Sequence, residues 1–210
     1  MPLRIVDSVS AIKKKVKKSM AEEINKRIRT RKTRLLTAYK KAVYRWVISS
    51  PFMKDLSLGG IGSIAAQFGL PAGSEQGAAD AIARAIVDST TVEFVKFSDS
   101  LSGTLKINFQ PKNFLNLLRL PEGFTTIQNS TYPKIHWMEW LIKKGDQVVV
   151  FDYKFVAQSG GRSGGGVMDS GGSFRVDPRY SGTEDSNVFT DMFKGREQQI
   201  SQILQKELFV

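Results

Sequence analysis

The sequence contains no cysteine and only one histidine, His136. Without cysteine the chain has no disulfide, no thiol nucleophile and no thiolate ligand for zinc or an iron–sulfur cluster. A single histidine also excludes metal sites that need a pair of imidazoles. These absences remove most redox and metal chemistry, and we expect neither a cofactor nor a bound metal.

Long apolar runs are absent as well. Runs such as Val148 to Phe151 fall far short of the roughly 20 residues that span a bilayer. The N-terminus lacks the apolar core of a secretion signal. We therefore expect a protein that is made in the cytoplasm and has no membrane partner.

Acidic residues are scarce in one part of the chain. Residues 1–46 contain 15 Lys or Arg and only three acids, a net charge of +12, whereas the remainder has a net charge of −1. At 210 residues the chain is long enough to bury a core of its own. We interpret it as a basic arm, residues 1–50, attached to a neutral domain, residues 51–210. Such an arm is suited to nucleic acid, an anionic membrane or an acidic protein surface.

Apolar residues recur every three or four positions through the arm, which predicts one long amphipathic helix or two in tandem. Weak helix formers at Thr30 to Thr33 mark the expected break, and Pro51 closes the region. The apolar series consists of Ile5, Val9, Ile12, Val16, Met20, Ile24 and Ile28, and it resumes at Leu35, Tyr39, Val43 and Trp46.

The basic side chains of the arm are the candidate contacts with DNA or a partner protein. Neutralising phosphates with them would give salt-dependent affinity without sequence specificity. The alternative is a solvated helix face whose apolar stripe lies in the core. Membrane-surface binding ranks third, because the arm's aromatic residues gather at one end. The candidate residues are Lys13, Lys14, Lys15, Lys17, Lys18, Lys26, Arg27, Arg29, Arg31, Lys32 and Arg34.

The rest of the chain predicts an α+β fold with a mainly antiparallel sheet of about four strands, followed by C-terminal helices. Alternation at Thr90 to Phe97 and Thr104 to Phe109 indicates a hairpin with one buried face. The other expected strands cover Asp146 to Gln158 and Gly172 to Pro178. The expected helices run from Asp55 to Phe68, from Ser74 to Ser89, from Asn113 to Leu120 and from Pro133 to Gly145, with two more at the C-terminus, the first capped by Thr183.

The stretch SGGRSGGGVMDSGG, Ser159 to Gly172, contains seven glycines. It does not match a Walker phosphate loop, because no lysine followed by Ser or Thr comes after its glycines and no helix is expected to follow. We interpret it as the tip of a hairpin that becomes ordered at a contact between subunits. The expected contact residues are Arg162, Gly164, Gly165 and Gly166, and valine at the three glycines is expected to leave the monomer folded while impairing assembly.

No group of polar residues forms a catalytic pattern. Glu139 follows His136 by one helical turn, a common structural pair, and the spacing of Asp169, Asp177, Glu184 and Asp185 matches no calcium loop. With no cysteine and a lone histidine, we expect the protein not to be an enzyme.

Several segments resemble a family of structural proteins from tailed bacteriophages, of the neck, head-to-tail connector or tail-completion type. They are ISSPFMKDLSLGGIGSIAAQFGLP, IHWMEWLIKKGDQVVVFDYKF, GRSGGGVM and GGSFRVDPRYSGTEDSNVFT. The resemblance implies a virion protein that forms an oligomeric ring around the DNA channel. Its implied partners are other copies of itself, portal or adaptor proteins, tail tube or sheath proteins, and DNA without sequence specificity. The alternative is a DNA-binding module that uses the basic helix, with the remaining domain for oligomerisation.

Overall fold

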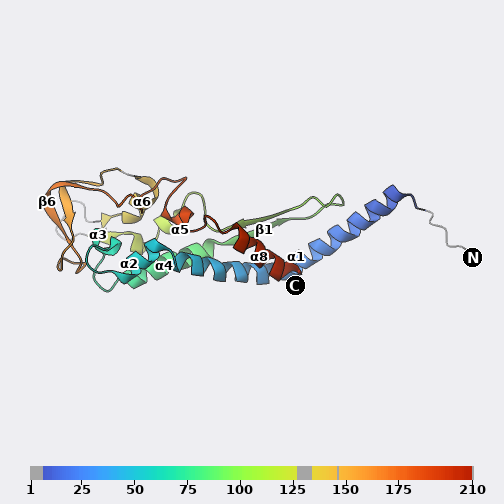
Figure 1. The fold of residues 1–210 in the computed structure, drawn as a ribbon, viewed down its shortest axis with the longest axis horizontal. Helices are drawn as coiled ribbons and strands as arrows, with labels where there is room; N and C mark the ends of the chain where they lie inside the picture. The colour runs from blue at the N-terminus through green and yellow to red at the C-terminus, as the bar shows by residue number, and fades with distance from the viewer. Residues whose placement is uncertain (1–6, 127–133, 146, 210) are drawn as a thin grey trace, which may run out of the picture. The chain divides into compact units, whose positions relative to one another are not determined.

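A computed structural model describes residues 7–126, 134–145 and 147–209 (Figure 1). The predicted α+β class and the long N-terminal helix are confirmed. The helices are α1 Val9–Ile48, α2 Pro51–Leu58, α3 Ile64–Gln67, α4 Glu75–Ser89, α5 Leu115–Leu118, α6 Trp137–Lys143, α7 Val188–Asp191 and α8 Glu197–Phe209, with a 3-10 turn at Pro121–Gly123. The strands are β1 Thr91–Val95, β2 Thr104–Asn108, β3 Thr125–Thr126, β4 Lys134–Ile135, β5 Val150–Val156 and β6 Val167–Phe174.

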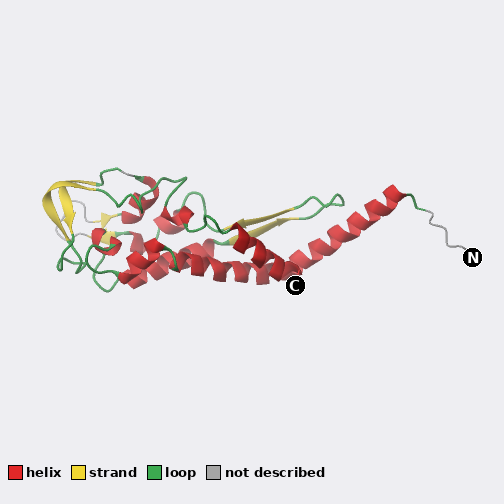
Figure 2. Ribbon diagram, viewed as in Figure 1, coloured by secondary structure: helices red, strands yellow, loops and turns green. Residues whose placement is uncertain are grey.

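The strands pair antiparallel in three separate ladders within the described chain, β1 with β2, β3 with β4 and β5 with β6 (Figure 2). The expected strands are thus antiparallel, but they form independent two-stranded sheets. The hairpin at residues 91–108 is confirmed, with Val92 opposite Ile107. Only Val92 on it is buried, so the hairpin covers α1 with little of its own surface.

Helix α1 is continuous over 40 residues and does not break at Thr30 to Thr33. Weak propensity costs only tenths of a kcal/mol per residue, roughly, and packing overrides it. Ile28 and Leu35, on either side of the expected break, are both buried. Packing of these two side chains therefore fixes the helix through the threonine-containing segment. Ile5, the first residue of the apolar series, lies outside the described residues.

Several helix starts differ from the sequence expectation, because side-chain caps decide them. Ser50 caps α2 by accepting from the Met53 amide, so Asp55 lies inside that helix. A second helix, α3, begins separately after Ser63. Asn187 rather than Thr183 caps α7, through a capping box with Thr190.

The expected helix at Pro133 to Gly145 is also shorter than predicted. Lys134 and Ile135 form strand β4 opposite β3, and α6 begins only at Trp137. Pro133, and Asp146 at the start of the expected strand, lie outside the described residues. The strand itself begins at Val150.

The chain divides into two compact units that do not follow the expected boundary at residue 50. The helix–hairpin unit comprises residues 1–39, 90–108 and 197–210. The glycine-loop unit comprises residues 40–89 and 109–196. Segments distant in sequence build both units, so tertiary contacts rather than local composition define them.

In the helix–hairpin unit, α8 and the hairpin attach to α1 by specific hydrogen bonds. The Asn25 side chain donates to the Phe97 carbonyl at 2.9 Å and accepts from the Phe97 amide at 2.8 Å. The buried Tyr39 hydroxyl donates to the Ile200 carbonyl at 3.0 Å, and burial raises the Tyr39 pKa to about 12. The Arg34 guanidinium lies 2.5 Å from the Glu207 carboxylate; because the later Tyr39 meets the earlier Ile200, α8 runs antiparallel to α1.

The two hydrogen bonds between the Asn25 side chain and the Phe97 backbone, here called the Asn25 clamp, give a direct test of this unit. Asn25→Ala removes two hydrogen bonds and is expected to destabilise the unit by about 2 kcal/mol, since each contributes about 1 kcal/mol. Amide hydrogen exchange should show faster exchange at Phe97 and along β1 and β2. Asn187→Ala, a substitution of the same type that removes the cap of α7 in the glycine-loop unit, is the control and should leave hairpin exchange unchanged. Unchanged protection in Asn25→Ala would contradict the clamp.

The core of the glycine-loop unit is aromatic. Trp137 is fully buried and stacks on Phe68 at 4.8 Å between ring centroids. Phe52 packs edge-on against Tyr180 and Phe189, at 5.6 Å from each. These contacts join α2, α3, α6 and α7, and they position the glycine stretch that follows β5.

Candidate interaction surface on the basic helix

The candidate basic residues lie along the exposed surface of α1. All are exposed except Arg31, which is half-buried. Four of them are engaged within the chain: Lys15 pairs with Asp7 at 2.7 Å, Arg27 pairs with Glu23 at 2.8 Å, and Arg31 and Arg34 both bind Glu207. The surface thus divides into residues that serve the fold and residues available to a ligand.

Seven candidate residues make no ion pair with any carboxylate in the described chain: Lys13, Lys14, Lys17, Lys18, Lys26, Arg29 and Lys32. They project from two segments of one continuous helix, residues 13–18 and residues 26–32. Such an array of uncompensated charge attracts polyanions and acidic surfaces.

The apolar series on α1 is covered only along part of its length. Beyond Met20 it is covered: Ile24 is half-buried, and Ile28 and Leu35 are buried, with exposures of 4% and 0%. Before Ala21 it is open, with exposures of 70% for Val9, 37% for Ile12, 51% for Val16 and 49% for Met20. We call these last four residues the open stripe. The expectation that the stripe lies in the core therefore holds for the second half only.

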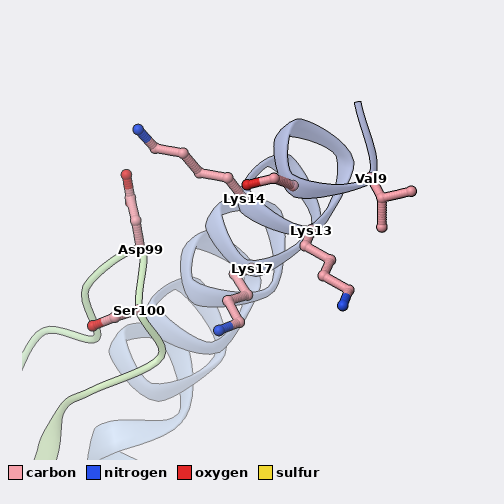
Figure 3. A pocket seen from close by; sticks show the side chains of 7 residues that line it. Val9, Lys13, Lys14, Lys17, Asp99 and Ser100 are labelled. Carbon is pink, nitrogen blue, oxygen red and sulfur yellow. The ribbon is translucent and has the colours of Figure 1, made fainter. Parts of the chain in front are cut away.

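A shallow hollow lies beside the first turns of α1 (Figure 3). Its helix side is lined by Val9, Ser10, Lys13, Lys14 and Lys17, and its other side by Asp99 and Ser100 in the β1–β2 turn. Lys14 leaves the helix on the side of Asp99, whereas Val9 and Lys13 project away from it (Figure 3). The lysines thus diverge over the helix surface and do not converge on one point.

The glycine stretch, the second candidate site, folds onto its own chain. Strand β6 begins at Val167, so only the first half of the stretch is a turn and the second half is strand. The Gly62 amide donates to the Gly165 carbonyl at 2.9 Å, and the Ala72 amide donates to the Arg162 carbonyl at 3.2 Å. The Arg162 guanidinium donates to the Gly69 carbonyl. Arg162 thus holds the loop on its own chain, and its expected role at a contact between subunits stays a prediction.

Crowding explains glycine at two of these positions. A Cβ on Gly165 would overlap the Gly60 carbonyl oxygen and lie 2.9 Å from the Ala66 Cβ. A Cβ on Gly166 would overlap the Phe155 ring, whereas one on Gly164 would meet only the Ala72 Cβ at 3.8 Å. The expectation that valine at all three positions leaves the monomer folded is wrong, because the loop is already packed.

His136 is a half-buried residue that packs against an aromatic ring. It precedes α6, stacks on Phe124 at 4.1 Å, and its Nδ1 lies 3.9 Å from the Glu139 carboxylate. Its Nε2 is buried. Burial lowers the His136 pKa from 6.5, and the nearby Glu139 opposes that shift only in part.

This lowered pKa predicts a pH dependence. The unfolded chain binds a proton at His136 more readily than the folded chain, so stability is full above pH 6.5 and falls as the pH drops below it. Urea unfolding at about pH 7.5 and pH 5.5 should show this loss, and His136→Gln should reduce it. An identical loss in His136→Gln would show that other groups are responsible.

The described residues contain no cluster of three or more His, Asp or Glu side chains placed to hold a metal ion. Asp177 instead pairs with Arg179 at 2.6 Å, which lowers the Asp177 pKa. Within residues 7–126, 134–145 and 147–209, no helix combines the length and the apolar character of a membrane span.

Sequence reasoning did not identify Asn25, Glu207 or the contact of Gly60 and Gly62 with the glycine stretch. Asn25 and Glu207 acquire their roles only from segments far away in the chain. The glycine-rich sequence LGGIG at residues 58–62 was a signal for close backbone approach.

Comparisons with protein-family models, with curated proteins and with solved structures find no match.

Proposed function

We propose that the protein is a non-enzymatic structural component of a tailed-phage particle. In this proposal it forms an oligomeric ring in the neck or upper tail, which joins head and tail around the DNA channel. Its partners are other copies of itself, the portal or adaptor, and tail tube or sheath proteins. The observation that carries an assembly role is the open stripe on α1, an apolar and lysine-rich surface that the described chain leaves uncovered.

Two further observations support the proposal. The segments that resemble the phage family contact one another: Phe68 stacks on Trp137, and Gly62 binds Gly165. They therefore build one packed module. The glycine-loop unit also exposes large apolar side chains, with Leu58 at 83%, Ile61 at 64% and Phe151 at 71%. Ring formation joins two different patches on successive copies, so exposed apolar patches are expected on such a subunit.

The test is to find the protein in particles. Quantitative mass spectrometry of purified particles should detect it at a fixed copy number, and electron microscopy should place it in a ring at the neck or upper tail. Leu58→Ser and Ile61→Ser are expected to impair ring incorporation without unfolding the chain. Absence of the protein from particles that carry a complete neck and tail would overturn the proposal.

The second candidate is DNA binding by α1, favoured by its seven basic residues without a carboxylate partner in the described chain. Duplex DNA affinity should fall with salt, each phosphate contact contributing about 0.9 to the logarithmic slope. Lys14→Gln with Lys18→Gln should reduce that slope. Deleting Met1 to Arg34 is a poorer test, because it removes the Asn25 and Arg34 contacts that hold the hairpin and α8. A salt-independent affinity would exclude this candidate.

A further inference from the structure

The open stripe has the form of a helix-packing seam. At about 100° per residue, its four side chains span only about 80° around α1. Val9 and Met20 are 11 positions apart, about three helical turns, so the stripe keeps close to the period of a straight helix. A second straight helix can therefore follow the stripe along its whole length. A membrane-surface helix needs a wider apolar face, commonly with aromatic residues, and the open stripe has neither.

The open stripe faces a different direction from the part of α1 that the chain covers. At about 100° per residue, its centre is rotated by about 120° from the face that carries Ile28, Leu35 and Tyr39. The reason is the spacing of four residues from Ile12 to Ile28, which exceeds the helical period and makes the apolar series wind around α1. The hairpin and α8 cover the later face, so the same contacts cannot cover the open stripe.

The charged residues that border the open stripe determine which kind of partner can bind it. Lys13 and Lys17 border one side of it and make no ion pair with a described carboxylate. On the other side Lys15 is paired with Asp7, and the stripe ends at the Glu23–Arg27 pair. A second copy of the same face would place lysine opposite lysine, which is unfavourable. DNA would neutralise the lysines but leave the apolar side chains without a cover.

The covered half of α1 shows the complementary chemistry. There α8 packs antiparallel to α1, buries Leu208, and directs the Glu207 carboxylate at Arg34. The backbone carbonyl of Glu207 also accepts from Arg31 at 3.3 Å. On this helix a carboxylate thus binds the basic side of α1, and the apolar residue next to it in sequence is buried.

We infer that the open stripe docks an acidic amphipathic helix of another protein. Apolar side chains of that helix cover Val9, Ile12, Val16 and Met20, and its carboxylates face Lys13 and Lys17. The inference rests on the proposed function, in which α1 meets a neighbouring virion protein, and it specifies the chemistry of that neighbour.

The test uses the full chain and two synthetic helical peptides of about 21 residues, long enough to form a helix. Both carry leucine along one face; one has glutamate and the other lysine at the flanking positions. Fluorescence anisotropy should show that the glutamate peptide binds at least about tenfold more tightly than the lysine peptide, and less tightly at high salt.

Substitutions on α1 localise the contact. Val16→Ser and Met20→Ser should each reduce the affinity for the glutamate peptide about tenfold, because each removes an apolar side chain that becomes buried in the complex. The double substitution Lys13→Gln with Lys17→Gln should reduce the affinity for the glutamate peptide about fivefold. Lys14→Gln with Lys18→Gln is the control of equal charge, since these residues lie about 160° from the centre of the stripe, and should change affinity less than about twofold. All four stripe residues are exposed, so circular dichroism melting should be unchanged.

Several outcomes would overturn the inference. Equal affinity for the two peptides would show that the flanking lysines do not select an acidic partner. Unchanged peptide affinity in Val16→Ser would show that the peptide does not bind the open stripe. Self-association of the chain that Val16→Ser abolishes would assign the stripe to a second copy. Binding to phosphatidylserine vesicles that Val16→Ser abolishes, without peptide binding, would assign it to a membrane. Absence of the protein from particles would overturn the virion role alone and leave the peptide result intact.

Discussion

Gly165→Ala is expected to destabilise the protein by about 3 kcal/mol, the upper range for overpacking a close contact. The new methyl group would overlap the Gly60 carbonyl oxygen and lie 2.7 Å from the Gly60 carbonyl carbon. The carbonyl oxygen and carbon of Gly60 cannot rotate away from the methyl group, because both belong to the backbone. The Gly62 amide donates to the Gly165 carbonyl at 2.9 Å, so moving the loop aside also breaks this hydrogen bond.

Gly164→Ala is the matched control, one residue away in the same turn. Gly164 has a φ of +68°, so alanine there costs about 1 kcal/mol of backbone strain, but its methyl group meets only the Ala72 Cβ at 3.8 Å. Urea unfolding should separate the two variants by about 2 kcal/mol. Equal stability of the two would mean that the glycine stretch does not pack on residues 60–66 in solution.

Trp137→Ala is expected to cost about 4 kcal/mol, in the range for truncating a buried aromatic side chain. The indole is 0% exposed, stacks on Phe68 and donates from Nε1 to the Glu122 carbonyl at 2.9 Å. Its loss leaves a cavity between α3 and α6. It also leaves the Glu122 carbonyl without this donor, so both packing and hydrogen bonding are reduced.

Two variants separate these contributions. Trp137→Phe keeps most of the ring stacking and loses the N–H donor, so we expect a cost of about 2 kcal/mol. Trp140→Ala removes a second tryptophan of the same helix that is only half-buried, and it should cost less than Trp137→Ala. Urea unfolding measures all three. A Trp140 variant as unstable as the Trp137 variant would contradict this description of the core.

Both predictions concern the glycine-loop unit, and they bear on how the assembly proposal is tested. Arg162 and Gly165 were expected to act between subunits, but in the structure they hold the loop on its own chain. Variants at these positions therefore affect folding first. Assembly is better tested at exposed residues such as Leu58, Ile61 and Val16, whose substitution leaves the core intact.

Features that depend on residue type and local period follow from the amino-acid sequence without the fold. These are the absence of thiol chemistry, the concentration of positive charge in the first 46 residues, the helical nature of the arm and the β1–β2 hairpin. Alternation and three-to-four spacing report which side chains share a face, so they survive without knowledge of the fold. The side chains that cap α2 and α7, Ser50 and Asn187, were harder to predict, because several polar residues competed for each position.

Tertiary structure alone decided which surfaces are covered. Apolar side chains line α1 both before and after Ala21, although the series winds around the helix, yet Val16 is 51% exposed and Leu35 is fully buried. The difference comes from the hairpin, α8 and the Asn25 and Glu207 contacts, which residues more than 70 positions away supply. Likewise, whether Gly165 is a free tip or a packed turn depends on Gly60 and Ala66, about 100 positions away. A local pattern shows that a face is apolar, but only the folded chain shows whether something already covers it.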